Sequence, residues 1–567
     1  MQFNDDEEPP PTTKPAPARP SRLVRLSKYH SSEAPLAPNV QEVMLELKCV
    51  SSATYRAPLD LVAVVDVSGS MEGDKLKQAQ EALIFIIRKL TDIDRLCIVA
   101  FEYTATVHRP LRRVTEAART ELEAVVRGLK ANDGTSIKAG LQAGLSVVAQ
   151  RRFTAGRAAN IMLMSDGQDT IPVDDPGNVP VHTFGFGDDH YAHVLEAIAN
   201  KSLGGVYNYV SDTTDPTNLS QTFSQILAGL VTIIPQDLEL TVTAFLGEAA
   251  IKDVHTGAYK PIPAGDGSSS VTVKFGALYS SEVRRVIVEL ALGDRIASPS
   301  YHANVAQVQY RFTFQGQKVA SDPVVITMNR SRRAPDPADE STKPPPVQAE
   351  LVRLKHVGSI KAAKEKADQN NMVEAWNILA EALNKLAEAA KKLVDPMFDM
   401  LRKELLKMLE LFKTWDTYQK RGKAFATSAI SSHDHQRIAA RGDAEEIRIF
   451  STPRMDIYLE QAKHPGKVIK SADDDALEEL EREPELEVPA TPPAEKWRTL
   501  SVVLRLLTAV LSLLAFSIMA SARTSGWAGN RYGRYEAYRL GAAMTCKFSF
   551  YFTFLMKSLK ILNRGGG

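Results

Sequence analysis

The run Leu61–Val67 (LVAVVDV) most strongly constrains what this chain can fold into. It is apolar throughout except for Asp66, which is the pattern of a parallel strand covered on both faces. After it, apolar residues recur with helical spacing at Leu76, Ala79, Leu83, Ile86, Ile87 and Leu90. The run therefore predicts a buried strand that leads into an amphipathic helix, the first unit of an α/β domain.

The same alternation continues to about residue 230. Further strands are predicted at Arg95–Phe101, Ala159–Ser165, Val179–Phe186 and Val206–Val210. Helices are predicted at Thr115–Lys130 and Ser136–Gln150, and around His190–Asn200 and Asp215–Leu230. Strands that alternate with helices form a doubly wound parallel sheet, whose ligands bind at the carboxyl ends of the strands. We expect this Rossmann-like α/β domain to occupy residues 59–232.

The pattern changes beyond this domain. Short β-rich runs separated by Gly, Asp and Ser predict an antiparallel β-sandwich at 233–330, which a strand within 36–58 can join. A polar, proline-rich linker is expected at 331–348, and a helical tail domain at 349–445. Residues 1–35 and the acidic stretch 446–496 have little to bury, so both are predicted to be disordered.

Charge and cysteine content exclude several classes of function. Lys and Arg number 69 against 68 Asp and Glu, so nothing favours nucleic acid as a partner. The sequence has three cysteines and no C-x-x-C pair, which excludes a zinc finger or RING module in it; they are Cys49, Cys97 and Cys546. Three cysteines so far apart do not favour a disulfide framework. The acidic, proline-rich N-terminus has no apolar stretch of the kind found in secretory signals.

Three separate motifs bring oxygen ligands to one edge of the predicted sheet. Asp66, Ser68 and Ser70 end the first strand, Thr135 precedes a helix in the loop DGTS, and Asp166 follows another strand in MSDGQDT. Two carboxylates and three hydroxyls suit a hard cation, Mg²⁺ or alternatively Mn²⁺ or Ca²⁺, which keeps net positive charge and an exchangeable position. A carboxylate of another protein can fill that position.

Other interpretations of these residues are weaker. Ser68, Ser70 and Thr135 can act only as helix N-caps. A phosphatase-like role for Asp66 lacks the second catalytic carboxylate that it needs. A metal site at His182, His190 and His193 lacks a carboxylate–histidine pattern, and His433 and His435 are predicted to be solvated loop residues.

The motifs D-x-S-x-S, NDGTS and MSDGQDT, in this order within an alternating domain, resemble the von Willebrand factor A (VWA) family. The resemblance implies a metal-ion-dependent adhesion site (MIDAS) and a non-catalytic protein-binding role, with no small-molecule substrate. Residues 40–445 resemble the plant subfamily that pairs this domain with a RING finger, to which ubiquitin ligase activity belongs. A substrate-recruiting component of such a ligase is therefore an alternative function.

The C-terminal segment 497–567 resembles a different family. Trp497–Arg539 is similar to the first membrane helix and loop of Casparian strip membrane domain-like (CASP-like) proteins, which scaffold the plasma membrane. Thr499–Ala522 is apolar enough to cross a bilayer of roughly 30 Å. Two explanations of this segment are open: a natural fusion of two proteins, or two genes merged into one gene model. A natural fusion predicts a protein of the plasma membrane with its VWA domain in the cytosol, and a membrane scaffold is then a further alternative function. A merged gene model predicts a cytoplasmic protein.

Overall fold

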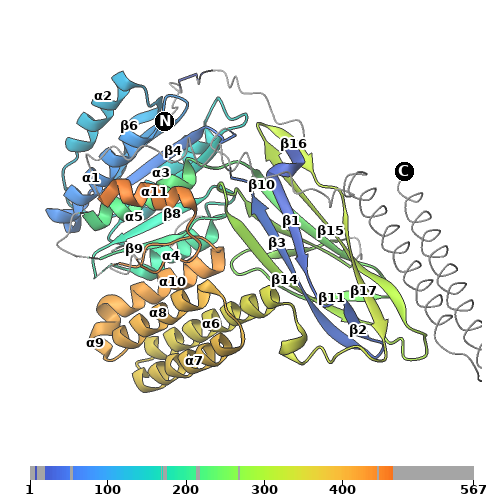
Figure 1. Ribbon diagram of the computed structural model, residues 1–567. Helices are drawn as coiled ribbons and strands as arrows, with labels where there is room; N and C mark the ends of the chain where they lie inside the picture. The colour runs from blue at the N-terminus through green and yellow to red at the C-terminus, as the bar shows by residue number, and fades with distance from the viewer. Residues whose placement is uncertain are drawn as a thin grey trace, which may run out of the picture. The chain divides into compact units, whose positions relative to one another are not determined.

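The structure is a computed structural model (Figure 1). It describes residues 7–8, 10, 20–51, 55–167, 169, 175–188, 190–211, 217–265, 269–442 and 446–463. The predicted membrane helix at 499–522 and the whole CASP-like segment lie outside these residues. Among the described helices, none combines the length and the apolar character needed to cross a membrane.

A six-stranded sheet with the order β6-β5-β4-β7-β8-β9 forms the centre of the α/β domain. Its strands are β4 (Leu59–Asp66), β5 (Arg95–Phe101), β6 (Ala105–Arg113), β7 (Ala158–Ser165), β8 (Val181–Phe186) and β9 (Tyr207–Val210). All pairs are parallel except β5 with β6, which is antiparallel. The doubly wound parallel sheet is confirmed, but the edge strand β6 was not predicted because its sequence, ATVHRPLRR, has no clean apolar alternation.

Helices cover both faces of this sheet, as the alternation of side chains along β4 requires. Ala63 and Val65 pack with α1 (Asp74–Lys89), α2 (Glu116–Arg127) and α5 (Thr217–Leu230) on one face. Val62 and Val64 pack with α3 (Ile137–Ala149) and α4 (Ala192–Lys201) on the other. Every residue of β4 is buried, which explains its continuous apolar run.

Two mainly antiparallel sheets, built from strands that lie before and after the α/β domain in the sequence, share one apolar core. One has the order β1-β3-β14-β11, with the strands Val24–Tyr29, Asn39–Cys49, Val283–Leu292 and Ala249–His255. The other contains β12 (Pro261–Pro263), β13 (Ser270–Gly276), β10 (Gln236–Ala244), β15 (Tyr301–Phe314), β17 (Val324–Ser331) and β2 (Glu33–Pro35), with β16 (Gln317–Ala320) paired to β15. The N-terminal strand β3 pairs with β14, and its side chains Val43, Leu45, Leu47 and Cys49 lie in this core.

The helical region comprises α6 (Pro345–Asp368), α7 (Met372–Lys392), α8 (Pro396–Leu411), α9 (Trp415–Thr417) and α10 (Lys423–His435). The α10 helix contacts α4 and β9 of the α/β domain as well as α6 (Figure 1). The expectation that His433 and His435 are solvated is wrong. Both lie at the end of α10 and are buried, because His433 packs against Glu404 and His356 of the helical region, and His435 packs against Tyr259 of the β-sheet region.

Both segments predicted to be disordered contain ordered structure. Residues 20–35 of the predicted segment 1–35 form a short 3₁₀ helix, β1 and β2. Residues Pro453–Lys463 of the predicted segment 446–496 form α11, which packs on α5. In each case a few apolar side chains, such as Val24, Met455 and Leu459, are buried against a neighbouring element. Composition averaged over the segment hides so small a number of contacts.

Candidate functional site

The D-x-S-x-S loop folds back over the carboxylate at the end of β4. Asp66 is fully buried, and its Oδ1 accepts a hydrogen bond of 2.8 Å from the backbone amide of Ser68. The hydroxyls of Ser68 and Ser70 lie 3.1 Å apart. The spacing of the motif thus brings two hydroxyls and one carboxylate together within a single turn.

The loop that carries Thr135 lies beside this turn. Ser68 forms an isolated parallel bridge with Asn132, and the amide of Asn132 donates to the carbonyl of Val67 over 2.7 Å. Thr135 itself is half-buried, three residues further along. Gly134 has φ of +92°, and a Cβ there would lie 2.3 Å from the Tyr103 ring, so the loop needs a glycine at this position.

Asp166 follows β7 at the same edge of the sheet, and its carboxylate lacks hydrogen bonds within the part of the chain that the structure describes. Its side chain is fully buried, yet neither carboxylate oxygen has a hydrogen-bond partner among the described residues. The ammonium of Lys75, at the start of α1, lies 3.6 Å from Oδ2. A buried carboxylate without hydrogen bonds is costly unless a cation is close to it.

The two carboxylates influence each other. Burial raises the pKa of the Asp66 carboxyl to about 6, and the nearby charge of Asp166 adds to this, against hydrogen bonds from Ser165 and Ser68. Two buried carboxylates at one edge repel each other, and a divalent cation between them would remove that repulsion. The residues present therefore fit a hard cation, for which Asp66 and Asp166 would be the charged ligands.

The capping interpretation is not supported in the described residues. Ser68 precedes the 3₁₀ turn Gly69–Met71 but makes no side-chain capping bond. The N-cap of α1 is Gly73, and the N-cap of α3 is Ser136, whose hydroxyl accepts from the amide of Ala139. The three hydroxyls at Ser68, Ser70 and Thr135 therefore do not serve as side-chain caps of α1 or α3.

Two further residues hold the site together and were missed in the sequence. The hydroxyl of Ser165 donates to Asp66 Oδ2 over 2.5 Å and accepts from the amide of Gly167 over 2.9 Å. The buried Asp169 accepts from the amide of Ile137, at the start of α3, over 2.8 Å. Both lie in the motif MSDGQDT, so their proximity to Asp166 in the sequence was the signal that could have found them.

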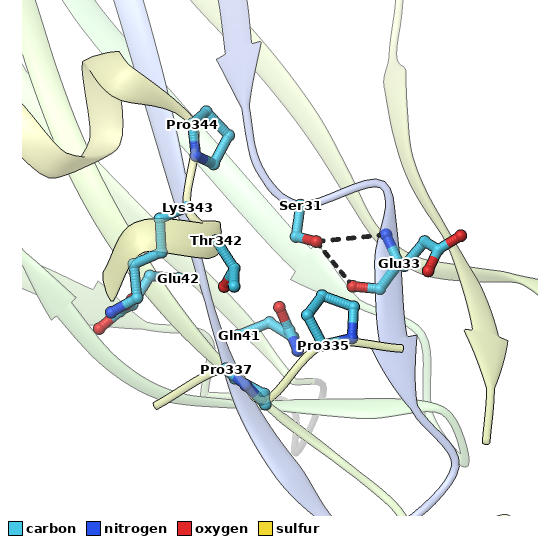
Figure 2. A pocket seen from close by; sticks show the side chains of 9 residues that line it. All are labelled: Ser31, Glu33, Gln41, Glu42, Pro335, Pro337, Thr342, Lys343 and Pro344. Carbon is cyan, nitrogen blue, oxygen red and sulfur yellow. Dashed lines mark hydrogen bonds and ion pairs between the residues drawn. The ribbon is translucent and has the colours of Figure 1, made fainter. Parts of the chain in front are cut away.

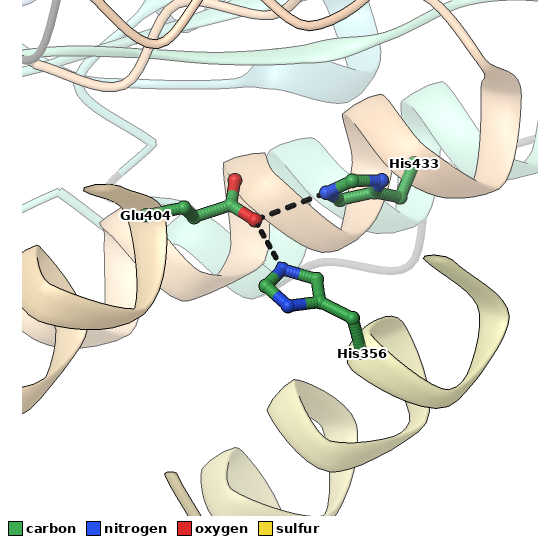
Figure 3. A group of neighbouring side chains, drawn as sticks. All are labelled: His356, Glu404 and His433. Atoms are coloured by element: carbon green, nitrogen blue, oxygen red, sulfur yellow. Dashed lines mark hydrogen bonds and ion pairs between the residues drawn. The ribbon is translucent and has the colours of Figure 1, made fainter. Parts of the chain in front are cut away.

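A second group with metal-binding side chains lies in the helical region. His356, Glu404 and His433 are buried, and their ligand atoms lie within 4.8 Å of one another (Figure 3). Both Nε2 atoms point at Oε2 of Glu404, from 2.6 Å for His356 and 3.0 Å for His433. The guanidinium of Arg441 lies 3.2 Å from the other carboxylate oxygen.

The contacts of this group favour a hydrogen-bonded cluster over a metal centre. Burial opposes ionisation of Glu404, but the charge of Arg441 and the two histidines hold its pKa well below the usual value. Burial lowers the pKa of His433 to about 3. A neutral His433 that donates from Nε2 accepts at Nδ1, where Arg353 donates from 3.5 Å. A metal on Nε2 would instead leave a proton on Nδ1 facing that guanidinium.

Comparison with known proteins agrees with the fold. Residues 59–208 match the family model of the von Willebrand factor type A domain, and residues 395–464 match the model "VWA / Hh protein intein-like". The chain therefore contains a VWA domain, which is a protein-interaction module. A von Willebrand factor type A protein from Catenulispora acidiphila has the same fold, with a TM-score of 0.56 and 17% identity over 74% of this chain and 97% of that one.

The chain is homologous to a plant ubiquitin ligase. It is 29% identical to E3 ubiquitin-protein ligase WAV3 of Arabidopsis thaliana over 51% of this chain and 38% of that protein. It is 28% identical to the uncharacterized protein sll0103 of Synechocystis over 48% of this chain and 66% of that protein. The matched part thus spans only about two fifths of the plant relative.

Proposed function

We propose that the VWA domain binds an acidic residue of a partner protein through a divalent cation and performs no catalysis itself. The cation, Mg²⁺ or alternatively Mn²⁺ or Ca²⁺, is held by Asp66, Ser68, Ser70, Thr135 and Asp166. The observation that carries this proposal is the buried Asp166 carboxylate, whose oxygens have no hydrogen-bond partner among the described residues although Asp66 is close by.

The chemistry of the ligand set supports a protein carboxylate as the bound group. The hydroxyls of Ser68, Ser70 and Thr135 are neutral, weak ligands, so the cation stays a good acceptor for a further anionic oxygen. Ser70 is exposed, which places this side of the site in contact with solvent. An exposed position beside a cation is where the side chain of a second protein can bind.

Metal titration of the full chain tests the site. Binding to the folded state alone raises stability by about 2.7 kcal/mol at a hundredfold excess over Kd, so Mg²⁺ or Mn²⁺ should raise the melting temperature. Asp66→Ala should abolish the rise, whereas Asp322→Asn, at an exposed position between β16 and β17, should preserve it. An equal rise in the Asp66 variant would exclude this residue from the site.

Partner binding has its own test. Affinity capture with the full chain should recover a protein in Mg²⁺ and lose it in chelator, and the Asp66→Ala chain should recover none of it. Recovery that is the same with and without chelator would show that the interaction does not use the cation.

The homology to WAV3 favours one second candidate, a substrate-recruiting role in a ubiquitin ligase. Residues 1–567 contain no C-x-x-C pair, so in this role they would act together with a RING that they do not themselves supply. With E1, E2 and ubiquitin alone, the purified chain should form no polyubiquitin, and co-purification should recover a RING protein. Chain formation without any added ligase would contradict the non-catalytic role.

We also propose a location that follows from residues 499–522. Insertion of this segment would hold the chain at the plasma membrane, with the VWA domain in the cytosol. If the segment is not part of the natural polypeptide, the protein is cytoplasmic. Protease treatment of sealed vesicles with the cytosolic face outward distinguishes the orientations, since protection of the VWA domain would contradict the proposed one.

A further inference from the structure

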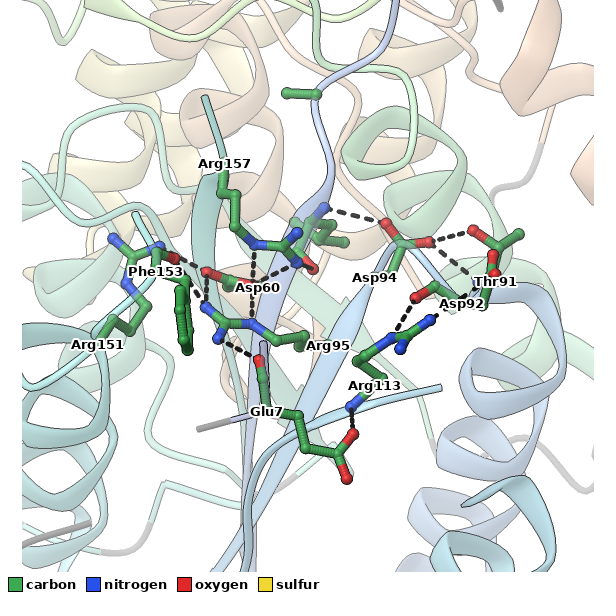
Figure 4. Close-up of polar contacts among 12 residues, drawn as sticks. Glu7, Asp60, Thr91, Asp92, Asp94, Arg95, Arg113, Arg151, Phe153 and Arg157 are labelled. Atoms are coloured by element: carbon green, nitrogen blue, oxygen red, sulfur yellow. Dashed lines mark hydrogen bonds and ion pairs between the residues drawn. The ribbon is translucent and has the colours of Figure 1, made fainter. Parts of the chain in front are cut away.

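The amino end of the VWA sheet, opposite the proposed cation site, holds a cluster of arginines around one aspartate (Figure 4). Asp60, near the start of β4, accepts from Arg95 at 2.8 and 2.7 Å, from Arg157 at 2.8 Å and from Arg151 at 2.9 Å. Asp60 and Arg95 are fully buried. Asp60 and Asp66 are six residues apart on one extended strand, so about 20 Å separates the two ends.

The charge of this cluster is unbalanced. Within these four side chains, one carboxylate meets three guanidinium groups, which sum to +2. Burial opposes ionisation of Asp60, but hydrogen bonds and charge from Arg95 and Arg157 hold its pKa below the usual value. Buried guanidinium groups need oxygen acceptors for their N–H donors, so this end of the domain favours an acceptor beside it.

Glu7 supplies such an acceptor with its backbone, and its carboxylate lies on the neighbouring strand β6. The carbonyl of Glu7 accepts from Arg95 Nη1 at 3.2 Å, and its carboxylate accepts from the backbone amide of Arg113 at 2.9 Å. Its other carboxylate oxygen lies 3.5 Å from Nε of Arg112, a buried nitrogen that has no hydrogen-bond partner among the described residues. The Glu7 amide reaches the carbonyl of Leu111 at 3.4 Å.

The contacts of Glu7 use both the backbone and the charge of β6. This strand is the edge of the sheet, so its outer amides and carbonyls are open to an added chain, and its sequence ends in Leu111, Arg112 and Arg113. An extended peptide that bonds to an edge strand while its side chains meet a charged surface is bound by β-augmentation. In the sequence Glu7 belongs to a run of four acidic residues, Asp5 to Glu8.

We propose that the β6 edge and its arginines form a second binding site of the VWA domain, specific for an extended acidic peptide, and that the chain's own acidic N-terminal run occupies it in cis. The guanidinium groups select carboxylates, and the edge strand selects an extended backbone. This site uses no cation, so it is independent of the proposed function. An acidic segment of a partner binds here only when the N-terminal run is displaced.

A peptide-binding assay tests this proposal with the full chain in excess chelator, so that the cation site cannot contribute. The probe is a fluorescent peptide of residues 1–11, measured by anisotropy. A chain in which Asp5, Asp6, Glu7 and Glu8 are changed to Asn or Gln should bind the peptide at least tenfold more tightly than the unaltered chain, whose site is filled. Binding should weaken steeply with salt, and a peptide with the same four substitutions should not bind.

Two arginines of β6 provide a matched control. Both Arg109 and Arg112 pair with Glu121, at 2.7 and 2.6 Å, but only Arg112 also meets Glu7. In the neutralised chain, Arg112→Gln should weaken peptide binding by about two- to fivefold, the range for partly exposed ion pairs, and Arg109→Gln should leave it unchanged. Hydrogen exchange at the Arg113 amide should be faster in the neutralised chain and slow again with peptide.

Three results would overturn the proposal. They are no binding of the peptide to the neutralised chain, equal binding to the neutralised and unaltered chains, and equal losses in the two arginine variants. Metal-induced stabilisation of the same preparations reports separately on the cation site, so failure of one site is not mistaken for failure of the other.

Discussion

His182 of β8 makes the stability of the VWA domain depend on pH in a way that one substitution can expose. Its ring is fully buried, and neither nitrogen has a hydrogen-bond partner among the described residues. Burial, together with the nearby charges of Arg437 and His435, lowers the pKa of His182 to about 3. In the unfolded chain the pKa of a histidine is about 6.5, so the unfolded state takes up its proton first as the pH falls.

The size of the effect follows from the two pKa values. A folded-state pKa below the unfolded one means that stability decreases as the pH falls from about 7 toward 3. Between pH 7 and pH 5 the unfolded chain gains most of one proton at this histidine and the folded chain gains almost none. The free energy of unfolding should therefore decrease by about 2 kcal/mol from this residue alone.

The variant His182→Leu removes the titrating group and keeps an apolar side chain in a buried strand. At pH 7 it should be at least as stable as the original chain, because an imidazole without hydrogen bonds costs about 1–3 kcal/mol. At pH 5 its advantage should grow by about 2 kcal/mol. Urea unfolding followed by far-ultraviolet circular dichroism at both pH values measures this difference.

An exposed position gives the control for this prediction. His302 on β15 is exposed, so His302→Leu should follow the pH dependence of the original chain. If the advantage of His182→Leu is the same at pH 5 and pH 7, His182 is not held neutral by burial and the reasoning fails.

Three other substitutions or treatments have defined outcomes. Asp166→Asn should abolish the rise in melting temperature with Mg²⁺, because it removes one of the two carboxylates at the site; an undiminished rise would contradict this. Glu404→Gln should lower the free energy of unfolding by about 3–5 kcal/mol in urea titration, since it leaves Arg441 buried without its carboxylate, and a loss below 1 kcal/mol would show the pair to be dispensable. The full chain should stay in the membrane fraction after alkaline carbonate washing, and a chain ending near residue 493 should not; release of both would argue against membrane insertion by residues 499–522.

Some features of this protein follow from local sequence because they depend on one segment at a time. The continuous apolar run of β4 reflects burial on both faces, and the polar residues directly after it must then lie at the carboxyl edge of a parallel sheet. Asp66, Ser68 and Ser70 meet within one turn for the same reason, since their spacing is set by the chain itself. The bond from Asn132 to Val67 adds the Thr135 loop to that edge, as expected for neighbouring strand and loop ends.

Other features depend on contacts that no local pattern contains. Ser165 reaches Asp66 across ninety-nine residues of sequence, and Arg157 reaches Asp60 across ninety-seven. The edge strand β6 has weak alternation of its own and is held by pairing with β5. Such pairings follow from the register of packed elements, which composition and periodicity do not specify.

By itself, the sequence determined the parallel sheet, its polar carboxyl edge and the residue types that suit a hard cation, since each is expressed in the spacing of neighbouring residues. Only the tertiary structure decided which polar groups are buried without local partners. His433 and His435 were predicted to be solvated, yet residues far from them in sequence, such as Glu404 and Tyr259, bury them. Glu7 belongs to a run that looks disordered, yet it lies on β6 beside the arginines. The physical reason is that burial and electrostatic balance are properties of all the elements that meet at a point in space, whereas a sequence pattern reports only one of them.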